Sequence, residues 1–152
     1  MNNNKSLLPY ALLRVAIGWL FLHEGINKLL TEGWTAKMYL TQSTGPLKGF
    51  FSWLASDSSL MTITDYSLCI LLVAVGTTLI VGILERYSII IGIVLLLMFY
   101  LAYPPLGDSI SQHTEGNYLL IDKNLIMAIA LFVCLKTNSA EEYGLERILI
   151  KK

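Results

Sequence analysis

The segment RVAIGWLFLHEGINKLL, residues 14–30, carries four ionisable side chains inside a run that is otherwise apolar. Arg14 and Lys28 are cations, Glu24 is an acid and His23 carries an imidazole. Side chains of these types can bind the polar end of a small molecule and move protons to or from it. Within a membrane each charge at a helix centre costs roughly 2.5–3.5 kcal/mol, so such charges need partners or water. The segment therefore predicts a polar site that other helices complete.

Asp122 and Lys123 stand near the start of the last apolar stretch of the chain. At 1.5 Å per residue, Glu24 lies about 8 Å beyond the middle of the first helix. If four helices alternate in direction, Asp122 and Lys123 enter the membrane at a similar depth. Two acids and two bases would then share one layer in the outer half of the bundle. We expect Glu24 or Asp122 to supply protons there, while Arg14 and Lys28 orient a ligand and stabilise negative charge on it.

The expected site combines proton-transfer groups with binding groups and aromatic walls. Neither the two cysteines nor the two histidines are placed to bind haem or a structural metal, so the sequence predicts no metal site. The catalytic candidates are Glu24 and Asp122, and the substrate-binding candidates are Arg14, His23, Lys28, Trp34, Tyr100 and Lys123.

These charges also have purely structural interpretations. Glu24 and Lys28 are four residues apart, which is the spacing of an ordinary ion pair within a helix. Arg14 can extend to the lipid headgroups, and Asp122 can cap the helix that follows it. His23 can sit at the membrane interface with a hydrogen bond to a carbonyl. The sequence leaves these alternatives open.

Gly18 and Gly25 lie on the same face of the first helix as Arg14, because a helix turns 100° per residue. Glycines let a second helix approach closely, so this face is expected to point into the bundle and not toward lipid. His23 points almost directly away from Arg14, which argues against one pocket that uses both side chains.

The composition favours a membrane as the solvent. Of the 152 residues, 55% are hydrophobic and 14% are charged, whereas soluble domains carry about 25% charged residues. The formal net charge is zero, which leaves no basic surface for nucleic acid. A helix needs about 20 mostly apolar residues to cross a bilayer. We therefore predict an all-α integral membrane four-helix bundle, one domain over residues 1–152, with helices at about 7–30, 66–84, 88–103 and 119–135 and membrane lipids around it.

The connection between the first two predicted spans is rich in aromatic residues. A solvated linker would not carry so many aromatic side chains, so we predict two short amphipathic helices, at about 33–41 and 46–54. They would lie on the outer membrane surface or cap the bundle. The STGP sequence between them is a turn signal.

The distribution of Lys and Arg predicts the orientation, because cytoplasmic loops carry an excess of both. The tail AEEYGLERILIKK predicts a short interfacial helix, with docking of a partner as the alternative. With both termini in the cytoplasm, the outer side holds Lys37 and Lys48, and the inner side holds Lys5, Arg86, Lys136, Arg147, Lys151 and Lys152.

Several segments resemble the DoxX/DoxD family of small membrane proteins. LLRVAIGWLFLHEGINKLL is similar to the family's opening helix, with R-x3-G and then G-x2-K-L. GWTAKMYLTQSTGPLKGFF resembles the segment that follows this helix, NYLLIDKNLIMAIALFVCL the entry to the fourth helix, and AEEYGLERIL the tail. The residues that carry the resemblance are Arg14, Gly18, Gly25, Lys28, Trp34, Tyr39 and Asp122.

The resemblance implies a four-helix protein of the bacterial or archaeal cytoplasmic membrane. The best-known member of the family is a subunit of an archaeal thiosulfate:quinone oxidoreductase. We therefore expect a quinone-linked oxidoreductase subunit, with a non-covalently bound quinone, a small sulfur substrate, and a redox partner protein or a second copy of the chain. Fold does not fix function, so a non-catalytic membrane scaffold or assembly factor is the alternative. A transporter is a third option, and the sequence offers no pair of broken helices for it.

Overall fold

The computed structural model describes residues 7–104, 121–137 and 139–150, with side chains described as far as residue 148. Every regular element in these ranges is a helix, which confirms the all-α prediction. The helices are α1 (Leu8–Leu30), α2 (Lys37–Thr41), α3 (Lys48–Leu54), α4 (Ser58–Val81), α5 (Glu85–Ala102), α6 (Lys123–Leu135), α7 (Ala140–Tyr143) and α8 (Glu146–Ile150).

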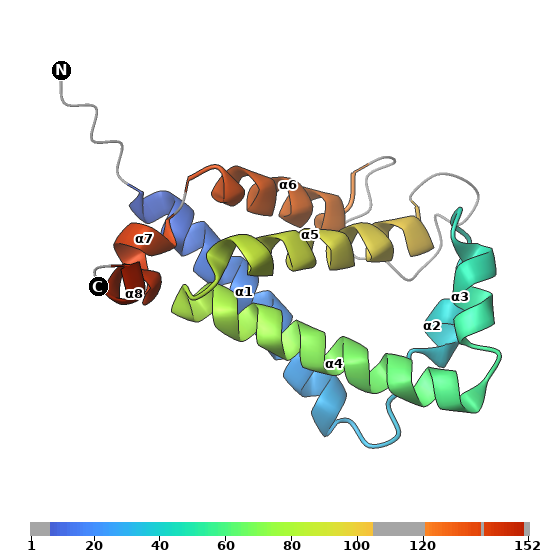
Figure 1. Ribbon diagram of the computed structural model, residues 1–152. Coiled ribbons are helices and arrows are strands. Elements are labelled where there is room, and N and C mark those ends of the chain that lie inside the picture. The colour runs from blue at the N-terminus through green and yellow to red at the C-terminus, as the bar shows by residue number, and fades with distance from the viewer. Residues whose placement is uncertain (1–6, 105–120, 138, 151–152) are drawn as a thin grey trace.

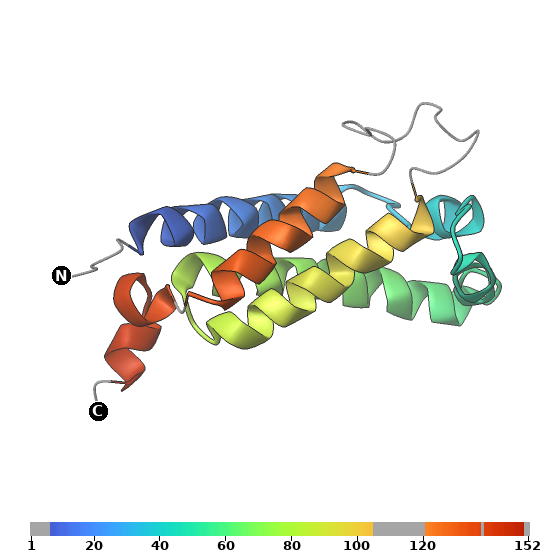
Figure 2. The ribbon, with the colours of Figure 1, turned by 90° about the horizontal axis from the view of Figure 1, so that it is seen from above.

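The four longer helices run side by side. α1 packs along α4, and α5 packs along α6 (Figure 1). Viewed from above, α6 lies between α1 and α5 (Figure 2), and it contacts both. The short helices α2 and α3 lie at one end, as the sequence predicts, and α7 and α8 lie at the other end, beside the start of α1. The end with α2 and α3 is hereafter the cap end.

Two of the described helices, α4 and α5, are long and apolar enough to cross a membrane by length and composition. α6 is apolar but has 13 residues, about 20 Å at 1.5 Å per residue. α1 has 23 residues and includes Arg14, Glu24 and Lys28, whose charges lower its mean hydropathy. The first two residues of the predicted 119–135 segment, and Lys5, Lys151 and Lys152, lie outside the described residues.

α4 is longer at its start than the predicted segment 66–84. It begins at Ser58, where the Asp57 carboxylate accepts the backbone N–H groups of Ser59 at 2.7 Å and Leu60 at 3.0 Å. This cap satisfies two of the four free N–H groups at the helix start. Hydrophobicity detects only the apolar part of a helix, so the polar first two turns were missing from the prediction.

The turn between α4 and α5 also differs from the prediction. α4 ends at Val81, and Gly82 is its C-terminal cap. Gly82 has a φ of 72°, a left-handed conformation that suits glycine and ends the helix. Leu84 adopts φ 52°, and α5 then starts at Glu85. The turn is therefore residues 82–84, and the ERY sequence expected as the loop forms the first turn of α5.

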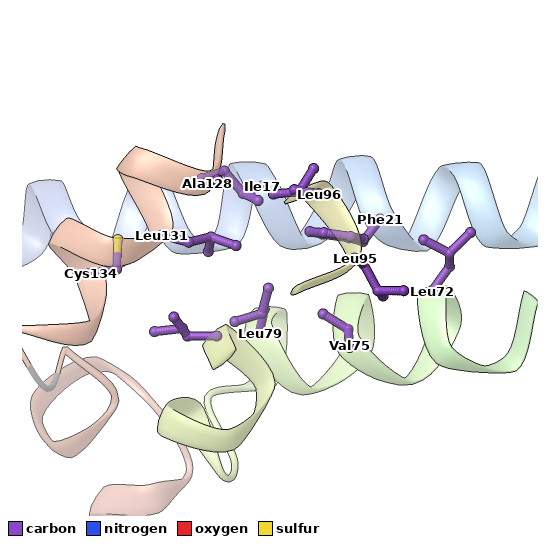
Figure 3. Packing of buried hydrophobic residues seen from close by; sticks show 11 residues of the cluster. Ile17, Phe21, Leu72, Val75, Leu79, Leu95, Leu96, Ala128, Leu131 and Cys134 are labelled. Carbon is purple, nitrogen blue, oxygen red and sulfur yellow. The ribbon is translucent and has the colours of Figure 1, made fainter. Parts of the chain in front are cut away.

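A single apolar core joins the four longer helices (Figure 3). A second cluster packs α2, α3 and the start of α4 against the end of α5, so the cap is part of the fold. The core residues are Ile17 and Phe21 from α1; Leu72, Val75 and Leu79 from α4; Ile89, Leu95 and Leu96 from α5; and Ala128, Leu131 and Cys134 from α6.

Glycines let α1 and α4 pack closely, as the Gly18 and Gly25 spacing predicts. A Cβ on Gly18 would lie 3.0 Å from the Gly76 carbonyl oxygen, and one on Gly76 would lie 2.7 Å from the Gly18 carbonyl oxygen. A Cβ on Gly25 would lie 2.9 Å from the Val73 nitrogen. Backbone atoms cannot move aside cheaply, so any side chain at these positions separates the helices.

We expect Gly76→Ala to lower the free energy of unfolding, although alanine favours helix over glycine by about 0.5–1 kcal/mol. The added methyl group meets the backbone of Leu22, and such overpacking costs about 1–3 kcal/mol. Gly49→Ala in α3 is the matched control, because open space surrounds Gly49 and helix preference acts alone there. Chemical unfolding in detergent, followed by circular dichroism, measures both. Equal stability of the two variants would contradict the close crossing.

Candidate functional site

A pocket of about 330 Å³ lies at the cap end, between α1, α2, α4, α5 and the start of α6. Its apolar wall includes Leu68 and Phe99. It is lined by five of the eight side chains that the sequence predicts for the site, namely Glu24, Lys28, Trp34, Asp122 and Lys123.

Lys28 is held by two partners in this pocket. Its Nζ atom lies 2.7 Å from Glu24 Oε1 and 4.6 Å from the centre of the Trp34 ring, an ion pair and a cation–π contact. The Lys28 side chain is 19% exposed and that of Glu24 is 55% exposed. The structural alternative for the pair is therefore present, yet Glu24 keeps solvent access and can exchange a proton.

Asp122 acts as the N-terminal cap of α6. Its Oδ1 accepts the backbone N–H of Leu125 at 2.8 Å, and its Oδ2 accepts the side-chain amide of Asn124 at 2.9 Å. Both bonds occupy the carboxylate oxygens, and the residue is 3% exposed. Of the two predicted proton donors, Glu24 is consequently the better placed. Lys123 is exposed and forms no ion pair with the described residues.

Tyr39 is a pocket residue that the sequence reasoning did not assign to the site. Its hydroxyl donates to the Phe99 carbonyl oxygen at 3.3 Å, and its own carbonyl oxygen accepts the Tyr103 hydroxyl at 2.7 Å. Burial, together with nearby Tyr103 and Asp122, raises the pKa of Tyr39, so its phenol stays neutral at ordinary pH. The available signal was its place in the GWTAKMYLTQSTGPLKGFF segment of the family resemblance.

Asp65 is a second residue that sequence reasoning missed. Its Oδ1 accepts the backbone N–H of Ala36 at 2.9 Å, which ties the start of α2 to α4. Because α2 carries Tyr39 and follows Trp34, this bond helps position the aromatic wall of the pocket. Asp65 lies in the polar start of α4, ahead of the apolar run that identified the helix.

A narrower groove of about 200 Å³ adjoins the pocket and shares Glu24, Phe99, Lys123 and Asn124 with it. Its other walls are mostly apolar and come from α1, α4, α5 and α6. His23 lines this groove and lies 3.2 Å from the Asn27 side-chain nitrogen. His23 is therefore next to the pocket and not among the residues lining it.

Arg14 and Tyr100 do not line the pocket. Tyr100 lies half-buried on α5. Arg14 precedes Glu24 by ten residues, about 15 Å along α1, and its side chain is completely buried. Its Nε lies 3.8 Å from Glu85 Oε1, and its Nη2 donates to the Tyr143 carbonyl oxygen at 3.1 Å. The structure thus places Arg14 near the opposite end of the bundle from the predicted ligand site.

The Arg14–Glu85 cluster joins three distant parts of the chain. Glu85 is 2% exposed; its Oε1 accepts the Ser139 hydroxyl at 2.6 Å and its Oε2 accepts the Ala140 N–H at 2.8 Å. The Nε and Nη1 atoms of Arg14 have no hydrogen-bond partner in the described structure. Sequence reasoning missed Glu85 because residues 85–87 were expected to form the short loop between the second and third predicted helices.

Comparison of the chain with protein-family models, with curated proteins and with solved structures gives no match. Within the described ranges, no three His, Cys, Asp or Glu side chains gather in an arrangement that could hold a metal ion. The functional assignment therefore depends on the pocket and on the motifs.

We expect Glu85→Leu to lower the free energy of unfolding by about 3–5 kcal/mol, because it leaves the Arg14 cation buried without a counter-charge. Adding Arg14→Leu should recover part of that loss, since no buried charge then remains. Lys28→Met is the comparison for an accessible pair and should cost below about 1 kcal/mol. Denaturant unfolding in detergent measures Glu85→Leu, Arg14→Leu, the double variant and Lys28→Met. If the losses of unfolding free energy in Arg14→Leu and Glu85→Leu sum to the loss in the double variant, the direct interaction is contradicted.

Proposed function

We propose that the protein is a four-span membrane protein of the DoxX/DoxD type that binds a quinone in the pocket at the cap end. In this proposal it is the quinone-binding subunit of an oxidoreductase in a bacterial or archaeal cytoplasmic membrane. The observation that carries the proposal is a pocket lined by charged side chains that adjoins a mostly apolar groove.

Apolar side chains exposed on all four longer helices support the four-span arrangement. A bilayer would cover large apolar side chains that otherwise face water, among them Trp19 on α1, Ile70 on α4, Ile90 on α5 and Phe132 on α6. Their relative exposures are 59%, 61%, 50% and 53%. α1 starts at the same end as α7 and α8, which is consistent with both termini in the cytoplasm and the cap end outside (Figure 2).

The two cavities match the two parts of a quinone. A pocket near 300 Å³ is large enough for a small ring, and the adjoining groove offers apolar walls for an isoprenoid tail. A quinone bound there would supply two-electron, two-proton chemistry. Lys28 would donate a hydrogen bond to the ligand, and Trp34 and Phe99 would pack against its ring. Solvent-accessible Glu24, paired with Lys28, would pass protons from water toward it.

Electrons would come from a partner protein or a small sulfur compound. The scaffold alternative draws support from the other end of the molecule, where Tyr143, Leu145 and Ile148 are exposed at 44%, 46% and 67%. These side chains offer an apolar face to a protein or to lipid. The two functions differ in their dependence on the pocket, so variants of pocket residues separate them.

Binding of a long-tailed quinone to the purified protein in nanodiscs tests the proposal. We expect Lys28→Met to weaken binding by roughly 10- to 100-fold, the loss of a charge-assisted hydrogen bond. Glu24→Gln should preserve binding better but reduce the proton uptake that accompanies reduction of the bound quinone. A quinone without its tail should bind more weakly than the long-tailed form, because the groove stays empty.

Lys48→Met and Glu141→Gln are the matched controls, since both side chains are exposed and lie away from the pocket. They should leave affinity unchanged. If affinity is the same in Lys28→Met and in these controls, the pocket is not the quinone site. Absence of quinone binding, together with a stable co-purifying protein, would favour the scaffold.

A further inference from the structure

A second cavity, of about 370 Å³, lies on the other side of Lys28 and Trp34 from the pocket. These two residues line both spaces, so they form the partition between them. The remaining walls come from residues 29–33 and from one face of α4, including Asp65, Tyr66 and Cys69.

The second cavity lies at the cap end and borders exposed parts of the chain. Glu32 and Tyr66 are exposed, whereas Asp65 is half-buried and Cys69 is 3% exposed at the deeper side. Lys28, Asp65 and Cys69 all line this cavity. The cavity therefore extends from the cap-end surface toward the Lys28 side chain.

The charges around the second cavity are unbalanced. Lys28 is neutralised by Glu24 at 2.7 Å, which leaves the carboxylates of Asp65 and Glu32. Asp65 accepts the Ala36 N–H, and neither acid forms an ion pair with the part of the chain that the structure describes. A hollow with excess negative charge concentrates cations and excludes anions.

We propose that the second cavity is the water-side approach to Lys28, and that it admits protons and small cations in preference to anions. The proposal rests on the proposed function in one respect, because a proton supply serves the pocket only if its ligand is reduced there. An anionic sulfur compound would then be disfavoured on this route, which favours a partner protein as the electron donor.

Native Cys69 reports on this entrance without any added mutation. The cation trimethylammonioethyl methanethiosulfonate and the anion sulfonatoethyl methanethiosulfonate differ in charge but use the same thiol chemistry. Each rate of Cys69 modification, read by peptide mass spectrometry, is divided by that reagent's rate with free 2-mercaptoethanol. Cys134, completely buried in the core near the other end, is the internal control and should stay unmodified in the folded protein.

We expect the normalised cation rate at Cys69 to exceed the anion rate by about tenfold, the lower range for charge-steered association. Asp65→Asn keeps an oxygen for the Ala36 N–H, and it should cut that ratio at least about threefold. Glu32→Gln should lower it less, because Glu32 is exposed and screened by solvent. Glu141→Gln, at the other end, should leave it unchanged.

Cys69 as unreactive as Cys134 would show that water does not enter and would overturn the proposal. A ratio of one or below, or a ratio unaffected by both Asp65→Asn and Glu32→Gln, would overturn the charge selectivity. No step of this measurement uses quinone. Failure of quinone binding with a selective Cys69 would therefore reject the proposed ligand and leave the entrance standing.

Discussion

Arg14 and Glu85 meet at 3.8 Å with almost no solvent contact, and the arrangement of the longer helices depends on that pair. Burying two charges costs several kcal/mol per ion unless each finds partners. Glu85 has the Ser139 hydroxyl and the Ala140 N–H, and Arg14 has the Tyr143 carbonyl oxygen. These contacts fasten α1, the start of α5 and α7 with its N-cap residue at one point.

Close backbone packing reinforces this attachment. A Cβ on Gly144 would lie 2.8 Å from the Gly82 carbonyl oxygen, and the same oxygen accepts the Glu146 N–H at 2.9 Å. From this point α1 follows α4 through the Gly18 and Gly25 contacts. A helix fixed at one end and packed through two glycines has a defined rotation. The position of Glu24 and Lys28 beside the pocket therefore follows from contacts at the opposite end of α1.

Sequence reasoning recovered the features that hydrophobicity and residue type control. It predicted the extent of α1, the two short helices of the cap and the meeting of Glu24 and Lys28 with Asp122 and Lys123. It could not detect the start of α4, because Ser58 and its neighbours are polar and the Asp57 cap is a local contact. It grouped Arg14 with Glu24 by helix face, although about 15 Å of helix separates them. The partner of Arg14 is 71 residues away in the chain, and only the fold identifies it.

The balance of charge in the pocket bears on the kind of ligand it suits. Glu24 neutralises Lys28, and the Asp122 carboxylate is already engaged with Leu125 and Asn124. Lys123 is the remaining cation of the lining, and it is exposed to solvent. A dianion would have to compete with Glu24 for Lys28 while facing the negative charge of Asp122. A neutral headgroup needs only a hydrogen-bond donor and an apolar surface, and its binding leaves the ion pair in place. The ion pair therefore favours a neutral, tail-bearing ligand over a small anion, which is the reason to place quinone, and not thiosulfate, in the pocket.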